Sequence, residues 1–143
     1  MVSITRAKRY DGPAIRKLEQ KVWKDRDVTG KYEDSYLIRF GYAFVAKEKR
    51  KIIGAILAMK TSNGELYVED VIIHPQWQRQ GIGRRLYETL LAAWEGGPVI
   101  ALVSTANEAS IRLHKELGFK AMKRIKDPFG IHVHTTSFLM RRG

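Results

Sequence analysis

The residues whose types and spacing indicate chemistry form a short basic segment, Gln78-Arg79-Gln80-Gly81-Ile82-Gly83-Arg84. It follows an apolar, β-branched segment that ends at Pro75 and precedes a segment whose apolar residues recur at helical spacing. The first N–H groups of a helix have no partner within the helix and carry partial positive charge. Glycines before and at such a start allow a sharp turn and close approach of a ligand. The segment therefore predicts a site for a phosphate or pyrophosphate.

This pattern has a simpler interpretation, which is a tight turn between a strand and a solvated, basic helix start. Two better-known phosphate motifs do not fit. The dinucleotide fingerprint requires a third glycine at position 86, where the chain has Leu86. A P-loop requires Gly-Lys-Ser/Thr, and that triplet does not follow Gly83.

Two adjacent carboxylates, Glu69 and Asp70, interrupt an apolar strand that we expect over residues 64–73. Burying a carboxylate costs free energy unless it has a partner. Because neighbouring strand residues point to opposite faces, Glu69 shares a face with Tyr67 and Ile73, and Asp70 does not. Glu69 therefore either pairs with a nearby lysine or arginine or has a functional reason to lie in this strand.

Composition bounds the class of protein. The chain has 143 residues, 44% of them hydrophobic, and we expect one domain over residues 1–143. The absence of cysteine excludes disulfides, a cysteine nucleophile and cysteine metal ligands. No apolar run is long enough for a membrane span or a signal peptide, so a cytoplasmic location is the simplest expectation.

The net charge of +11 raises a rival function, because basic domains often bind nucleic acid. The lysines and arginines are dispersed, however, and neither a zinc-finger spacing nor an RNA-recognition motif is present. A basic field also suits a cofactor that carries several phosphates.

The expected element order is β-α-α-β-β-β-α-β-α-β-β, which is a mixed α/β domain with helices flanking a central sheet. Strands are predicted at 4–7, 42–46, 52–59, 64–73, 99–104, 119–125 and 135–141. Helices are predicted at 13–22, 36–40, 82–94 and 107–117, the first of them capped by Asp11. Residues 24–34 are expected to form a loop. The apolar run at 99–103 predicts a strand that is buried on both faces.

Two segments carry a family resemblance. Gln78-x-x-Gly81-x-Gly83 resembles the Arg/Gln-x-x-Gly-x-Gly/Ala signature of the GCN5-related N-acetyltransferase (GNAT) family. The segment 107–119 is similar to the family's second signature, Asn-x-x-Ala-x-x-x-Tyr-x-x-x-Gly-Phe. The resemblance is strong over residues 64–120. It implies the GNAT-type fold, acetyl-coenzyme A as cofactor, and two parallel strands (64–73 and 99–104) that splay apart to admit the pantetheine arm.

The resemblance also implies which residues hold the cofactor. Those expected to contact it are Ile72, Ile73, Gln78, Arg79, Gln80, Gly81, Ile82, Gly83, Arg84, Asn107 and Lys115. Asn107 fits a helix N-cap equally well, since asparagine favours that position. Lys115 approaches the adenine or the 3′-phosphate in this interpretation, and otherwise lies on a solvated helix face.

Acetyl transfer to an amine needs a base for the amine and benefits from an acid for the departing thiolate. Glu69 is the expected base, acting directly or through water. His114 stands where the family has tyrosine, so it is the expected acid, against a partly exposed histidine without a role. Asp70, Tyr67 and His134 are the expected acceptor-binding residues. No metal is expected, because His132 and His134 lack a third ligand.

We therefore expect an N-acetyltransferase that transfers the acetyl group of acetyl-CoA to a primary amine. The acceptor is a small molecule, a polyamine, or a peptide or protein N-terminus. The resemblance implies that residues 22–36 and 127–135 shape the pocket that binds it. The alternatives are a non-catalytic acyl-CoA sensor and a basic nucleic-acid-binding module. No membrane partner is expected, nucleic acid is disfavoured, and the resemblance leaves a homodimer open.

Overall fold

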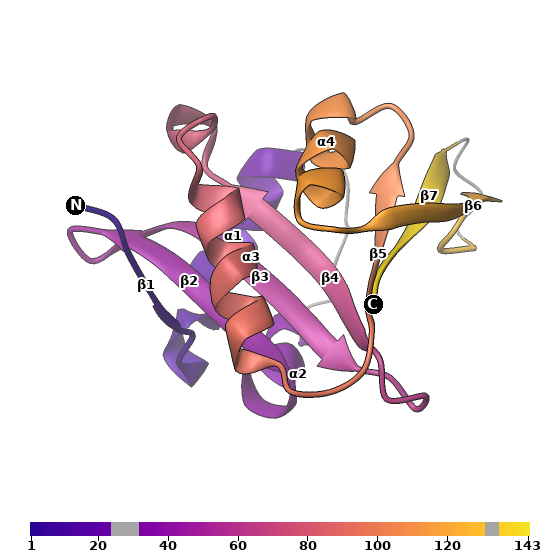
Figure 1. The fold of residues 1–143 in the computed structure, drawn as a ribbon. Coiled ribbons are helices and arrows are strands. Elements are labelled where there is room, and N and C mark those ends of the chain that lie inside the picture. Colours follow the sequence, from indigo (N-terminus) through magenta and orange to yellow (C-terminus); the bar gives the residue numbers. More distant parts are fainter. Residues whose placement is uncertain (24–31, 131–134) are drawn as a thin grey trace. The chain divides into compact units, whose positions relative to one another are not determined.

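The structure is a computed structural model that describes residues 1–23, 32–130 and 135–143. Its element order confirms the predicted order and the mixed α/β class (Figure 1). The strands are β1 Ser3–Arg6, β2 Tyr42–Glu48, β3 Lys51–Lys60, β4 Leu66–Ile73, β5 Val99–Ser104, β6 Lys120–Lys126 and β7 Thr136–Arg142. The helices are α1 Gly12–Trp23, α2 Glu33–Phe40, α3 Ile82–Ala93 and α4 Glu108–Glu116. Two short 3₁₀ turns, Arg9–Asp11 and Pro75–Trp77, were not predicted.

The strands follow the hydrogen-bonded order β1-β2-β3-β4-β5-β7-β6. Strands β4 and β5 pair in parallel, whereas the pairs β1/β2, β2/β3, β5/β7 and β6/β7 are antiparallel. The chain forms two compact units, the first made of Met1–Met59 and Glu69–Glu95 and the second of Lys60–Val68 and Gly96–Gly143. The assignment of residues 1–143 to a single domain stays a prediction.

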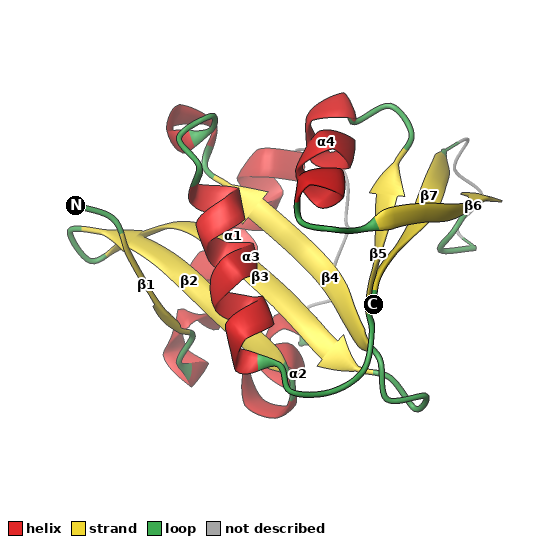
Figure 2. Ribbon diagram, viewed as in Figure 1, coloured by secondary structure: helices red, strands yellow, loops and turns green. Residues whose placement is uncertain are grey.

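The first unit has helices on both faces of its strands (Figure 2). Helices α1 and α2 cover one face through a buried apolar core, whose members on the helices and on β2, β3 and β4 are Ile15, Leu18, Leu37, Ala43, Val45, Ala55, Leu57 and Ile72. On the other face, α3 packs against β1 and β2. Continuous burial along the middle of β2 and β3 matches this arrangement, because successive strand residues point to opposite faces and both faces are covered.

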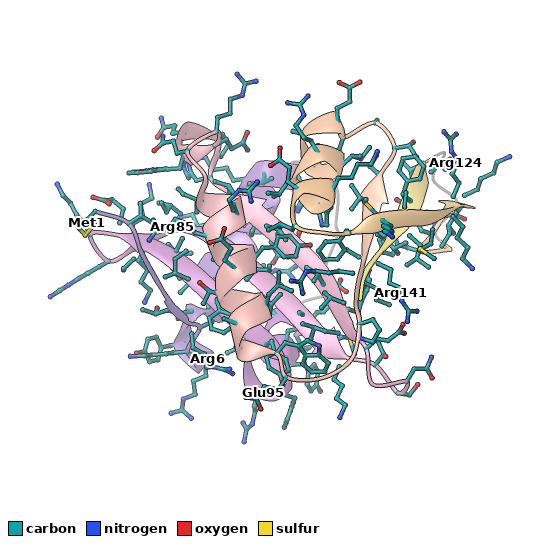
Figure 3. The ribbon with its side chains drawn as sticks, viewed as in Figure 1. Met1, Arg6, Arg85, Glu95, Arg124 and Arg141 are labelled. Carbon is teal, nitrogen blue, oxygen red and sulfur yellow. The ribbon has the colours of Figure 1, made fainter. Side chains whose placement is uncertain are left out.

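Polar contacts tie β1 to the rest of the first unit. Arg85, labelled in Figure 3, extends from α3 and donates from Nη2 to the carbonyl oxygen of Val2 at 3.1 Å. Asp11, the expected helix cap, instead accepts the N–H of Lys8 at 2.8 Å and lies 3.7 Å from the Lys47 ammonium. Such partly exposed ion pairs contribute little, so burial of the apolar core carries most of the stability of this unit.

One glycine of the first unit marks a close approach of two backbone segments. Helix α2 ends at Gly41, whose N–H donates to the carbonyl oxygen of Leu37 at 3.0 Å. A Cβ at position 41 would collide with the carbonyl oxygen of Ala58 on β3. The chain therefore enters β2 at this point only because residue 41 has no side chain.

The second unit contains β5, β7 and β6 with α4. Parallel pairing of β4 with β5 covers three residue pairs, Leu66–Val99 to Val68–Ala101, although both strands continue beyond it. The predicted splay of the two strands stays a prediction. Burial along β5 alternates between buried and half-buried residues, so the expectation of a strand buried on both faces is wrong. Its half-buried positions arise because only one face of β5 is fully covered.

Two arginines that are labelled in Figure 3 make contacts within the second unit. Arg141 Nη1 lies 3.2 Å from Glu65 Oε2, and the Arg124 guanidinium lies 5.2 Å from the centre of the Phe138 ring. Arg142 Nε donates to the carbonyl oxygen of Leu117 at 2.9 Å, which links β7 to the end of α4. Part of the large positive charge thus serves internal contacts.

Candidate functional site

The glycine-containing segment has an unusual backbone between β4 and α3. Arg79 has φ of 64° and Gly81 has φ of 77°, both in the left-handed region. Gly81 is the N-cap residue of α3, and the next residue, Ile82, is only 3% exposed. Glycine adopts this conformation without the steric cost that a side chain brings. The buried Ile82 anchors the helix start while the residues before it stay outside the core.

The structure brings together two of the predicted cofactor residues. The Gln78 side chain donates from Nε2 to the carbonyl oxygen of Ile73, the last residue of β4, at 3.2 Å. Gln78, Arg79, Gln80 and Gly81 are exposed, and Gly83 and Arg84 are half-buried. The segment is therefore fixed at both ends and accessible in between.

The start of α3 has the properties of an anion site. It opens a twelve-residue helix, and among the described residues no side chain caps it. A Cβ built on Gly81 meets no atom within 4 Å, so the space above this residue is open. Uncapped N–H groups at a helix start, an open approach and the adjacent Arg79 suit a phosphate group. The residues present here fit the pyrophosphate of coenzyme A.

Two further predicted cofactor residues lie in the second unit, on α4. Asn107 is the N-cap of α4, and its Oδ1 accepts the N–H of Ser110 at 3.1 Å. The capping interpretation is therefore confirmed, while a contact with the cofactor stays a prediction. Lys115 is exposed on the same helix, which agrees with the interpretation that it lies on a solvated helix face.

His114 is buried, with 4% exposure, so the alternative of a partly exposed histidine is wrong. Its Nδ1 lies 2.7 Å from the carbonyl oxygen of Ser110, and its ring packs edge-on against Phe119 with 5.1 Å between ring centres. A carbonyl oxygen can only accept, so Nδ1 carries the proton. Burial lowers the pKa of His114 below its usual value, although the Ser110 contact opposes this shift.

This geometry constrains the chemistry of His114. A neutral imidazole with its proton on Nδ1 presents Nε2 as an acceptor, not as a donor. His114 would therefore protonate a thiolate only from its imidazolium form, which a lowered pKa makes scarce near neutral pH. The role of His114 as acid stays a prediction, and the structure supports it less than the sequence does.

Burial alternates along β4, where Glu69 is half-buried and Asp70 is buried. Both carboxyls nevertheless have neighbours on α2, which are Glu33 for Glu69 and Asp34 for Asp70, so the expectation that they point to opposite faces stays a prediction. Burial raises the pKa of Glu69 to about 7, and a hydrogen-bonded contact with the Glu33 carboxyl on α2 adds to the effect. A carboxylate with a pKa near 7 is poised to accept a proton at neutral pH.

Asp70 belongs to a buried group of carboxyls from three elements of the first unit, which we call the acidic cluster: Glu19 on α1, Asp34 on α2 and Asp70 on β4. Their side chains are 3%, 3% and 8% exposed, in that order. The Glu19 carboxyl contacts both Asp34 and Asp70. Burial, together with neighbouring carboxyls, raises the pKa of Asp34 to about 8 and that of Asp70 to about 6.

His134, a metal site and a surface hollow remain to be placed. His134 lies outside the described residues. Metal binding by clustered side chains also finds no support, since the described part of the chain holds no group of three His, Asp or Glu residues arranged to bind an ion. The exposed side of α2 carries a shallow hollow of about 360 Å³, lined by Tyr32, Ser35, Tyr36, Arg39 and Phe40. This hollow faces away from the buried Asp34 and Leu37, so it is not part of the acidic cluster.

Sequence reasoning missed Glu19. A signal was available, because Glu19 follows the buried Ile15 and Leu18 on the apolar face of α1, where a carboxylate is out of place. His74 is also buried, and its Nδ1 accepts the N–H of Gln76 at 3.1 Å. Its role is to fix the turn after β4.

Comparison with known proteins places the chain in a family. The sequence profile of the Acetyltransferase (GNAT) family matches residues 12–119, so the chain belongs to that family. Members of this family use acetyl-CoA as the acetyl donor. The match includes both signatures, from the Gln78 segment to Phe119.

Two curated relatives show what similar proteins do. N-alpha-acetyltransferase RimI of Mycobacterium tuberculosis is 38% identical over 61 residues, which are 43% of this chain and 39% of the relative. The [ribosomal protein bS18]-alanine N-acetyltransferase of Salmonella typhimurium is 28% identical over 116 residues, or 76% of this chain and 74% of the relative. The chain thus spans about two fifths of the first relative and three quarters of the second.

A solved structure confirms the fold. The structure of yncA from Salmonella typhimurium, determined with its cofactor acetyl-CoA, aligns with a TM-score of 0.81 at 22% identity. The alignment covers 99% of this chain and 92% of that chain. Among the helices of residues 1–23, 32–130 and 135–143, none combines the length and apolarity needed to cross a membrane.

Proposed function

We propose that this protein is an acetyl-CoA-dependent N-acetyltransferase that acts on a primary amine. The observation that carries the proposal is the open, uncapped start of α3, where Arg79 and Gly81 both adopt left-handed backbone conformations. Such a backbone presents successive N–H groups to one point, which suits a pyrophosphate. Membership of the GNAT family supports coenzyme A as its carrier.

The cofactor is held, in this proposal, by backbone groups more than by side chains. Residues from Gln78 to Arg84 bind the pyrophosphate, and Ile72 and Ile73 offer backbone groups at the end of β4. Asn107 and Lys115 on α4 are further proposed cofactor residues, carried over from the family's second signature. Bound acetyl-CoA supplies the acetyl group as a reactive thioester.

Glu69 acts as the base. An alkylammonium ion carries its charge at neutral pH and cannot attack a carbonyl carbon, so one proton must leave first. Glu69, whose pKa is raised to about 7, accepts this proton directly or through one water. The neutral amine then forms the N–C bond while the C–S bond breaks, which yields an amide and coenzyme A thiol.

The acceptor is a primary amine of a small molecule, a polyamine, or a peptide or protein N-terminus. Tyr67, Asp70 and His134 remain the proposed acceptor-binding residues, and a cytoplasmic location and a homodimer stay predictions. The relative from Salmonella typhimurium acts, by its name, on an alanine of ribosomal protein bS18. A protein N-terminus is therefore one class to test, beside diamines and simple monoamines.

Release of coenzyme A thiol tests the proposal directly. Purified protein is mixed with acetyl-CoA and a panel of amines, comprising 1-aminobutane, 1,4-diaminobutane, spermidine and an alanine-starting peptide. We expect amine-dependent thiol release and a mass increase of one acetyl group on the acceptor. Binding of acetyl-CoA without turnover on any amine would favour the acyl-CoA sensor. Absence of binding, with salt-sensitive binding of nucleic acid, would favour the basic nucleic-acid module.

A further inference from the structure

Strand β6 is an open edge of the second unit. It pairs with β7 on one side and, among the strands that the structure describes, has no neighbour on the other (Figure 1). An edge strand presents N–H and C=O groups along its outer side that the sheet leaves unpaired. All residues of β6 except the half-buried Ile125 are exposed. Both the backbone edge and the side chains of β6 are therefore accessible.

The side chains of this edge are strongly basic. Four of them are cations, namely Lys120, Lys123, Arg124 and Lys126. Residues 117–143 contain six lysines and arginines but only one acidic residue. In addition, Arg141 on β7 lies directly opposite Lys120, and like charges in opposite positions destabilise a pair of strands. The edge thus holds positive charge that weakens the hairpin to which it belongs.

The described residues balance little of this charge. Arg141 has an internal partner, Glu65, whose Oε2 lies 3.2 Å from the arginine Nη1. Within residues 1–23, 32–130 and 135–143, no carboxylate forms an ion pair with Lys120, Lys123 or Lys126. These three lysines are exposed, so their ammonium groups can contact an external anion without any change in the core.

Lysines on an edge strand also have a protective role, because they hinder pairing with another copy of the chain. The strand at the other end of the sheet order shows how little charge such protection needs. Strand β1 has four residues, and its one charged side chain is that of Arg6. Protection therefore does not account for all four cations of β6, although it disfavours a second copy as the occupant of this edge.

The placement of charge on β6 distinguishes a peptide from a nucleic acid. Lys123 lies opposite Leu139 and Lys126 lies opposite Thr136, so the two lysines belong to opposite faces of the sheet. Single-stranded nucleic acid follows one basic surface and stacks its bases on aromatic side chains. A peptide strand added at an edge places side chains on both faces with a period of two. Cations on both faces, beside an open backbone edge, fit the peptide.

We propose that the edge of β6 binds an acidic segment of a partner protein, which adds to the sheet as an extended strand. Backbone hydrogen bonds along the edge supply affinity, and carboxylates of the segment contact Lys120, Lys123 and Lys126. Met122, which is 58% exposed at the register shift of β6, offers an apolar contact. This docking site goes beyond the proposed function, since it lies within the second unit and does not require acetyl transfer.

Fluorescence anisotropy with a labelled peptide tests the site on the whole chain. In the probe, pairs of glutamates alternate with pairs of valines, so that both faces of the extended peptide carry carboxylates. In the control peptide, N-methylvaline replaces valine, which keeps every charge and removes N–H donors from both edges. We expect the probe to bind about tenfold more tightly than the control peptide. Equal binding of the two peptides would overturn the inference.

Charge reversal on β6 is the second test. Lys123→Glu/Lys126→Glu changes both faces of the strand at exposed positions, so we expect it to fold and to bind the probe about tenfold more weakly. Lys17→Glu/Lys60→Glu, at exposed positions on α1 and β3, gives the same net charge and should bind as the wild type does. Undiminished binding by the β6 variant, or an equal loss in both variants, would overturn the inference. If thermal unfolding shows that the β6 variant does not fold, the two peptides on wild-type protein still decide.

Amide hydrogen exchange locates the bound peptide. We expect the probe to slow exchange within residues 120–126, and the N-methylated peptide to leave it unchanged. Tighter binding of oligouridylate than of the probe, with the same loss in Lys123→Glu/Lys126→Glu, would assign the edge to nucleic acid instead. A wild-type dimer that dissociates in this variant, as measured by sedimentation, would assign it to a second copy. Either result would overturn the acidic partner.

Discussion

The start of α3 and the acidic cluster belong to the same unit and are opposite in almost every respect. The first is exposed, basic and built mainly from backbone groups that follow one another in the chain. The second is buried, acidic and built from side chains of α1, α2 and β4. An anion can be bound by one turn of helix, because successive N–H groups already point one way. Carboxyls from three elements meet only where the fold brings them together.

The two sites also differ in how strongly water and salt weaken their charge interactions. Charges at the exposed loop are screened by salt, so each contributes modestly. Carboxyls in the acidic cluster are shielded from water, so burial raises the pKa values of Asp34 and Asp70. We therefore expect substitutions at the loop to change cofactor affinity, and substitutions in the cluster to change stability.

Glu69→Gln should have the largest effect. Removing the base should lower kcat/KM by about 100- to 10,000-fold. In the wild type, the rate should rise with pH through about 7, because Glu69 accepts a proton only when it is ionised. The variant should lose this rise, which steady-state rates between pH 5.5 and 9 will show. An unchanged profile in Glu69→Gln would assign the base to another group, and Glu88→Gln serves as control.

Asp34→Asn should make the protein more stable in alkaline solution. The unfolded chain releases the Asp34 proton above about pH 4, whereas the folded protein retains it up to about pH 8. The wild type therefore loses stability as pH rises through this window. At pH 8 we expect the variant to unfold at a higher urea concentration than the wild type, with a free energy of unfolding that is larger by roughly 2 kcal/mol. At pH 4 the two proteins should differ little in stability. A variant that is less stable than the wild type at both pH values would contradict the claim that the buried Asp34 carboxyl lacks a hydrogen-bond donor.

Arg79→Gln should have the smallest effect. The change removes one exposed charge beside the α3 start, so acetyl-CoA affinity should fall about two- to fivefold at low salt. The difference should shrink at high salt, because screening already weakens the contact in the wild type. Arg50→Gln is the matched control, since Arg50 is also exposed and has positive φ, at 71°. Equal losses in both variants would point to a general effect of net charge.

Most of the fold was predictable because it depends on local patterns. Helical spacing after Gly81, alternation along β4 and the turn at Lys49–Arg50 follow from the sequence, and the structure has all three. The tight turn before α3 was predictable for the same reason, since its glycines are consecutive with the helix in the chain. The strand at 99–104 was misjudged because an apolar run does not show how much each face is covered.

The acidic cluster could be predicted only in part. Asp70 stood out within an apolar strand, but its partners lie 36 and 51 residues earlier in the chain, at Asp34 and Glu19. Only packing of α1 and α2 on β4 brings these carboxyls together, and a charge on an apolar helix face was the one local sign. His114 illustrates the same limit, because its burial depends on Phe119 and on the end of α4.

Thermal unfolding with and without acetyl-CoA tests the central claim most directly, on wild type, Gly81→Glu and Gly64→Glu. Both glycines have positive φ, 77° and 79°, and open space around the added Cβ, so the two variants carry the same strain and charge. A ligand at a hundredfold excess over its dissociation constant stabilises the folded state by about 2.7 kcal/mol. We predict a rise in melting temperature for wild type and Gly64→Glu and none for Gly81→Glu. No rise in the wild type, or an equal rise in all three, would contradict a cofactor site at the start of α3.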